Sequence, residues 1–156
     1  MNLRIIIDHF NKIRIKNSSN TVMDGYFIRP TGTTPSVNFR PGNGELELRG
    51  NSMPDDPLSF YGHVFSHLPA LDNDELKAIN VNFALKNIED SSTYLHILIK
   101  KLISLSSEKR PLNITWYYEK NRTNILEIGR EISEHYSHPF KFVEVFKIKD
   151  QLRQAS

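Results

Sequence analysis

The sequence of 156 residues contains no cysteine. Disulfides, thiolate metal sites and a cysteine nucleophile are therefore excluded, and the composition fits a reducing compartment. No apolar run approaches the roughly 20 residues that a membrane-spanning helix needs. Arg4, Asp8 and Lys12 interrupt the first 15 residues and break the apolar block that a signal peptide requires. We therefore expect a cytoplasmic protein that does not contact a membrane.

An excess of charge of one sign is also missing. The 20 lysines and arginines stand against 18 aspartates and glutamates, and the formal net charge is +2. The basic residues are scattered, and the longest basic runs are the pairs at 100–101 and 109–110. Because no basic stripe could follow a phosphate backbone, we expect no nucleic-acid partner. The length suits one domain with one hydrophobic core.

The familiar motifs of catalysis are absent as well. The chain has neither a Gly-rich phosphate loop nor a nucleophile elbow. His63 and His67 are spaced to share one helix face, but the glutamate of a zinc-protease helix does not lie between them. Such histidines more often flank a core-facing stripe. The sequence therefore predicts neither an enzyme, nor a metal site, nor a cofactor.

The hydrophobic pattern predicts an α/β fold. Apolar and polar residues alternate around residues 37–39, 45–49, 79–85, 112–118 and 140–145, which is typical of strands, whereas helical spacing marks residues 55–68, 91–106 and 124–136. Strands that alternate with helices imply crossover connections and a partly parallel, mixed sheet of about five strands. Because the strands are not apolar throughout, we expect three helices chiefly on one face. Leu98 and Leu102 lie on the apolar stripe of the second helix and should be core residues.

Composition also divides the chain into three segments. Residues 13–35 are rich in Asn, Ser, Thr, Gly and Pro, so residues 1–34 are interpreted as an N-terminal extension and connector. The segment between Leu3 and Ile15 is a short helix or an added strand, and its apolar spacing matches neither period well enough to choose. Residues 35–147 form the predicted domain, and residues 148–156 a polar C-terminal tail.

One polar segment deserves a functional hypothesis. Glu89, Asp90, Ser91, Ser92 and Thr93 connect a predicted strand to the most regular predicted helix. The carboxyl ends of strands in open α/β sheets are where ligands and partners are met. A serine or aspartate here could cap the helix. Alternatively, a phosphorylated serine would meet the free N–H groups of the helix N-terminus. The residues alone favour capping over phosphorylation.

Several motifs resemble a known family in their order and spacing. They are Thr34-Pro35, the run GELELRGNSMPDD at 44–56, WYYE at 116–119, ILEIG at 125–129 and HPF at 138–140. Across residues 33–146 the chain is similar to the SiaC-like regulatory phosphoproteins, which resemble STAS domains, the anti-sigma-factor antagonists. The resemblance implies a bacterial partner-switching protein. A serine/threonine kinase would phosphorylate it, a PP2C-type phosphatase would reverse this, and the unphosphorylated form would bind a target such as a diguanylate cyclase, with a role in biofilm control.

The chain departs from this family at the junction of residues 89–93. The family pattern there is Asn-Thr-Ser-Ser with the threonine as phosphoacceptor, and Asp90, or Glu89 in another alignment, takes that position here. Two hypotheses remain. In the first, which we favour, an exposed Ser91 accepts the phosphate as in STAS antagonists, with Ser92 and Thr93 as alternatives. In the second, Asp90 permanently imitates the phosphate and the protein is a constitutive scaffold or decoy.

Overall fold

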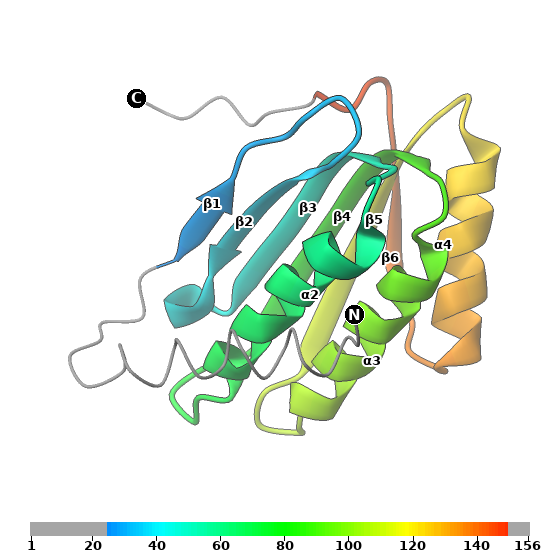
Figure 1. The fold of residues 1–156 in the computed structure, drawn as a ribbon. Helices are drawn as coiled ribbons and strands as arrows, with labels where there is room; N and C mark the ends of the chain where they lie inside the picture. Colours follow the sequence, from blue (N-terminus) through cyan, green and yellow to red (C-terminus); the bar gives the residue numbers. More distant parts are fainter. Residues whose placement is uncertain (1–24, 150–156) are drawn as a thin grey trace.

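The computed structural model describes residues 25–149 and shows one six-stranded sheet with helices packed against it (Figure 1). The segment between Leu3 and Ile15 lies outside the described residues. The strands follow one another across the sheet in chain order. The elements are β1 (Tyr26–Ile28), β2 (Ser36–Arg40), β3 (Glu45–Ser52), α2 (Pro57–His67), β4 (Ile79–Ile88), α3 (Ser92–Leu105), β5 (Leu112–Glu119), α4 (Thr123–His135) and β6 (Lys141–Val145), with short 3-10 turns η2 (Pro41–Asn43) and η3 (Leu68–Leu71).

The predicted mixed α/β fold is confirmed. β1, β2 and β3 pair antiparallel, and β3 to β6 pair parallel through helical crossovers. The number of strands was underestimated, because β1 was not predicted. This strand has only three residues, so it is too short to show an alternating pattern. Its pairing with β2, in which Phe27 lies opposite Asn38, is decided by the tertiary structure.

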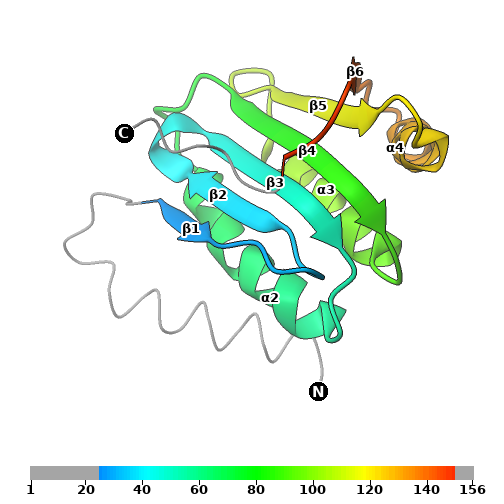
Figure 2. The same ribbon diagram turned by 90° about the horizontal axis from the view of Figure 1, so that it is seen from above.

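The two faces of the sheet differ as predicted. Leu48, Phe83 and Trp116 lie side by side in register and are fully buried. Figure 2 shows α2 and α3 on one side of the sheet, and the same side carries these apolar rows. The neighbouring row on the opposite face is polar and runs through Asn38, Glu47, Asn82, Thr115 and Lys141. A sheet that is covered on one face only accounts for the alternating strand pattern.

The core side of α3 also agrees with the sequence pattern. Leu95, Leu98, Ile99 and Leu102 are all 0% exposed. Their spacing places them on one helix face, which packs against the sheet and α2. The burial of Leu98 and Leu102 confirms the predicted phase of this helix.

Helix α4 approaches the sheet closely because Gly129 has no side chain. The indole of Trp116 lies against this glycine, and a Cβ added at residue 129 would lie 2.6 Å from the Cε2 atom of Trp116. The Nε1–H group of Trp116 donates a hydrogen bond of 3.0 Å to the carbonyl oxygen of Ile125, one turn earlier. Any larger residue at position 129 would push the helix away from this contact.

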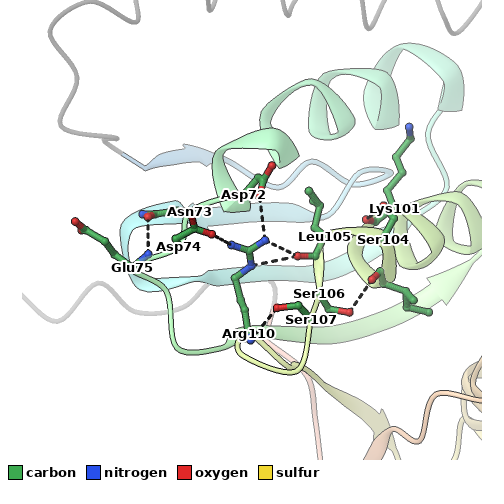
Figure 3. A network of polar contacts seen from close by, with 11 residues as sticks. Asp72, Asn73, Asp74, Glu75, Lys101, Ser104, Leu105, Ser106, Ser107 and Arg110 are labelled. Atoms are coloured by element: carbon green, nitrogen blue, oxygen red, sulfur yellow. Dashed lines mark hydrogen bonds and ion pairs between the residues drawn. The ribbon is translucent and has the colours of Figure 1, made fainter.

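Arg110 joins the segments at the end of the domain where β5 begins (Figure 3). Its side chain is largely buried, and Nη2 donates to the carbonyl oxygen of Leu105 at 2.8 Å and to Oδ1 of Asp72 at 3.0 Å. The first contact closes the connection from α3 to β5, and the second ties it to the segment after η3. This end of the sheet is therefore fixed by charge-assisted hydrogen bonds.

We expect Leu98→Ala to lower the free energy of unfolding by about 2–5 kcal/mol, because it leaves a cavity in the core. Chemical denaturation monitored by circular dichroism measures this loss. Lys100→Ala is the matched control, since Lys100 is exposed on the same helix. Equal midpoints for the two variants would contradict the packing of α3.

Gly129→Ala should destabilise the protein by about 1–3 kcal/mol, although alanine favours an isolated helix by about 1 kcal/mol. The overlap of the new Cβ with the Trp116 indole outweighs the gain in helix propensity, so the net change in stability is unfavourable. A double-mutant cycle with Trp116→Phe tests this cause, because the smaller ring should reduce the cost of Gly129→Ala. Strictly additive effects would show that the Trp116 contact is not responsible.

Candidate functional site

The candidate site is the connection from β4 to α3, at the carboxyl end of the parallel strands (Figure 1). The last residue of β4, Ile88, pairs with Ser52, the last residue of β3. The next residue, Glu89, donates its backbone N–H to the carbonyl oxygen of Ser52 at 3.0 Å. The start of the connection is therefore held against the end of β3.

The backbone turns sharply at Asp90. This residue has a φ angle of 54°, in the left-handed region that aspartate tolerates better than most residues. Ser91 follows as the N-cap of α3, and its carbonyl oxygen accepts from the N–H groups of Tyr94 and Leu95 at 3.0 and 3.1 Å. Its hydroxyl group makes no capping hydrogen bond. The capping hypothesis is thus confirmed for the position of Ser91 but not for its side chain.

The predicted exposure of Ser91 is wrong, because its side chain is 0% exposed. The hydroxyl donates to the carbonyl oxygen of Ser52 at 2.8 Å and lies 2.7 Å from the Ser52 hydroxyl. These two contacts satisfy the hydrogen-bonding capacity of the buried Ser91 hydroxyl without solvent. The position of Ser52, far away in the sequence, decides this burial.

Three buried hydroxyl groups form a chain with a defined direction. The Ser91 hydroxyl has one proton, which it donates to the Ser52 carbonyl oxygen. The Ser52 hydroxyl must therefore be the donor in its contact with the Ser91 hydroxyl. Tyr61 must then donate to the Ser52 oxygen, which lies 2.6 Å away. Burial raises the pKa of Tyr61 to about 12, so the phenol keeps its proton. The hydroxyl chain, as we call Tyr61, Ser52 and Ser91, links α2, β3 and α3.

The remaining predicted residues face solvent. Glu89, Asp90, Ser92 and Thr93 are all exposed. Ser92 and Thr93 open helix α3, where backbone N–H groups are not used within the helix. The structure thus brings two carboxylates and two hydroxyl groups together at one accessible helix N-terminus, and it places only Ser91 inside.

Partly exposed aromatic side chains pack against Tyr61 of the hydroxyl chain. The ring of Tyr94 stacks on Tyr61 at 5.8 Å between centroids, and the ring of Phe60 meets Tyr61 edge-on at 5.1 Å. Ile97 lies one turn after Tyr94 and is also partly buried. Such residues offer a partner both aromatic area and a rigid base.

A polar ladder flanks the other side of the connection. The Asn87 amide donates to Oδ1 of Asn51 at 2.7 Å, and Nη1 of Arg122 donates to Oδ1 of Asn87 at 3.2 Å. The Asn51 amide in turn donates to the carbonyl oxygen of Gly32 at 3.1 Å. These contacts fix the end of β4 just before the junction.

Sequence reasoning did not assign roles to Ser52 and Tyr61. Ser52 lies within the run at 44–56 on which the family resemblance rests, and Tyr61 lies in the aromatic pair that follows it. A polar serine at the end of an alternating strand was the only available signal. Its partners come from other elements, so the sequence alone could not reveal the hydroxyl chain.

His63 and His67 pack among other rings. His63 and His67 pack their rings at 4.9 Å, and the ring of Tyr26 lies 4.1 Å from that of His67. Burial lowers the pKa of His63. Within residues 25–149, no three or more His, Asp or Glu side chains converge as metal ligands. The helices in this part of the chain are too short or too polar to cross a membrane.

Known structures share this fold. The crystal structure of apo-SiaC from Pseudomonas aeruginosa matches with a TM-score of 0.67 and 22% identity, covering 77% of this chain and 98% of that chain. A crystal structure of the diguanylate cyclase SiaD in complex with its activator SiaC, from the same organism, matches with a TM-score of 0.69 and 21% identity. This match covers 77% of this chain and 99% of the matched chain.

Sequence comparison identifies the family. An uncharacterized protein of Pseudomonas aeruginosa strain UCBPP-PA14 is 24% identical over 119 residues, which are 76% of this chain and 94% of that protein. The pattern described as SiaC family regulatory phosphoprotein matches residues 28–145, from the end of β1 to the end of β6. This match spans all three helices and the junction at residues 89–93. The chain therefore belongs to the SiaC family of regulatory phosphoproteins.

Proposed function

We propose that this protein is a cytoplasmic, non-enzymatic regulator that binds and activates a diguanylate cyclase. Its family is regulatory, and the similar protein SiaC is the activator of the cyclase SiaD in their crystal structure. The observation that carries the proposal is the exposed junction of residues 89–93, which lies beside the half-exposed rings of Phe60 and Tyr94. An apolar centre with a charged border is the usual composition of a protein contact.

We propose further that phosphorylation controls the binding of a partner to this surface. A serine/threonine kinase adds the phosphate and a PP2C-type phosphatase removes it. Because Ser91 is buried, the accessible acceptors are Ser92 and Thr93. A phosphate at this helix N-terminus is compatible with the fold. It adds nearly two negative charges beside Glu89 and Asp90, so it weakens the contact with a partner that the unmodified surface attracts.

A second candidate function follows from Asp90. This exposed carboxylate lies in a left-handed turn. It takes the place of the acceptor threonine when the family pattern is aligned on Ser91-Ser92, whereas Glu89 takes that place in the other alignment. In this alternative the protein is a constitutive, non-phosphorylated scaffold or decoy that no kinase controls, and Asp90 permanently imitates the phosphate. Asp90→Asn tests this role, because asparagine also tolerates the left-handed conformation. A β-branched threonine at the same φ angle would strain the turn.

Activation of a purified diguanylate cyclase should fall about tenfold when Ser92→Glu and Thr93→Glu are combined, which corresponds to about 1.4 kcal/mol of binding free energy. The added charge imitates a phosphate on the contact surface. Formation of the cyclic dinucleotide at increasing regulator concentration measures the effect. Asn113→Asp is the control, since it adds a charge near the start of β5, at the opposite end of the parallel strands. Full activation by the double variant would contradict the proposed contact surface.

Co-expression with a candidate serine/threonine kinase should increase the intact mass by one phosphate. Peptide mapping should place it on Ser92 or Thr93, and alanine at the modified position should abolish the increase. The constitutive alternative predicts an unchanged mass and a change in cyclase activation with Asp90→Asn. These two measurements therefore decide between the candidate functions.

A further inference from the structure

We infer that the hydroxyl chain of Tyr61, Ser52 and Ser91 determines which hydroxyl of the junction can be modified. It withholds Ser91 and leaves Ser92 and Thr93 accessible. Ser52 and Tyr61 are thus positioning residues, which select the acceptor without being modified. The inference rests on the proposed phosphorylation for its biological meaning, but the accessibility on which it depends can be measured on the protein alone.

Ser52 is the centre of this arrangement. Its carbonyl oxygen accepts from the Ser91 hydroxyl at 2.8 Å and from the Glu89 N–H at 3.0 Å. Its hydroxyl donates to Ser91 at 2.7 Å and accepts from Tyr61 at 2.6 Å. All three side chains of the hydroxyl chain are 0% exposed. Because a buried hydroxyl without a partner is unfavourable, the contacts hold the start of α3 in one position.

This position prevents reaction at Ser91. In phosphoryl transfer from ATP, the hydroxyl oxygen forms a bond to the γ-phosphorus, the bond from that phosphorus to the ADP oxygen breaks, and the hydroxyl proton passes to a base of the kinase. The proton of Ser91 is held by the Ser52 carbonyl, and its oxygen is not accessible to ATP. A phosphate at this place would also bury nearly two charges without cationic partners.

Reaction at Ser91 therefore requires the junction to open. The hydrogen bonds that join Ser91 and Glu89 to Ser52 oppose this opening. Ser92 and Thr93 need no such opening, since both are exposed in the closed structure. The hydroxyl chain thus converts a row of three adjacent hydroxyl residues into two accessible acceptors and one protected position.

Single-cysteine variants test the inference directly, because the natural chain contains no cysteine. Ser91→Cys, Ser92→Cys and Thr93→Cys are each reacted with a small uncharged maleimide. We expect Ser91→Cys to react at least about tenfold more slowly than the other two, since a buried thiol reacts only after local opening. Equal rates at all three positions would overturn the inference.

Second substitutions identify the cause of the protection. Adding Ser52→Ala should accelerate Ser91→Cys about tenfold and leave Ser92→Cys unchanged. Tyr61→Phe removes one donor and should act in the same direction with a smaller effect, so it serves where Ser52→Ala does not fold. Ser66→Ala is the matched control, because Ser66 is also buried but donates to the His63 carbonyl, outside the hydroxyl chain.

An unchanged Ser91→Cys rate with both Ser52→Ala and Tyr61→Phe would overturn the inference, as would equal acceleration by Ser66→Ala. The proposed function is tested separately, by cyclase activation and by the intact mass. Its failure would therefore leave the maleimide rates unaffected. Where a kinase modifies the natural chain at Ser92 or Thr93, Ser52→Ala should add phosphate at Ser91. Detection of phosphate on Ser91 in the natural chain would also contradict the protection.

Discussion

The hydrogen bonds of Ser52 are the interaction on which the arrangement of the candidate site depends. Ser52 ends β3, yet its carbonyl and hydroxyl groups bind the turn after β4, the N-cap of α3 and a tyrosine of α2. The left-handed turn at Asp90 is held in place because both of its neighbours, Glu89 and Ser91, are bound to Ser52.

The one-sided architecture explains where function can reside. All three helices pack on the apolar face, and their N-termini follow the carboxyl ends of β3, β4 and β5. Backbone N–H groups and exposed polar residues therefore collect at one edge of the domain. The opposite edge is closed by Arg110, whose buried guanidinium group is already used by Leu105 and Asp72. The surface that we propose as regulatory lies at the first edge, where Glu89, Asp90, Ser92 and Thr93 are exposed.

The role of Ser91 shows how tertiary contacts revise a motif. In amino-acid sequence, Asp90-Ser91-Ser92 resembles a phosphoacceptor motif in which the first serine is phosphorylated. In the fold, the same serine is a buried link between strands and helices, and the accessible hydroxyl groups come one and two residues later. In the proposed switch, the buried residues beside the acceptor decide which oxygen a kinase can reach.

Elements whose signal is local and periodic are predictable from the amino-acid sequence. The apolar stripe of α3 and the alternation along β4 and β5 depend on residues close together in the chain, and each helix begins and ends within two residues of its predicted bounds. Motif order also predicted the family. The pairing of the short β1, the contact of Gly129 with Trp116 and the burial of Ser91 depend instead on tertiary contacts. Each of these joins residues far apart in the chain, and no periodicity within one segment encodes the position of a partner in another.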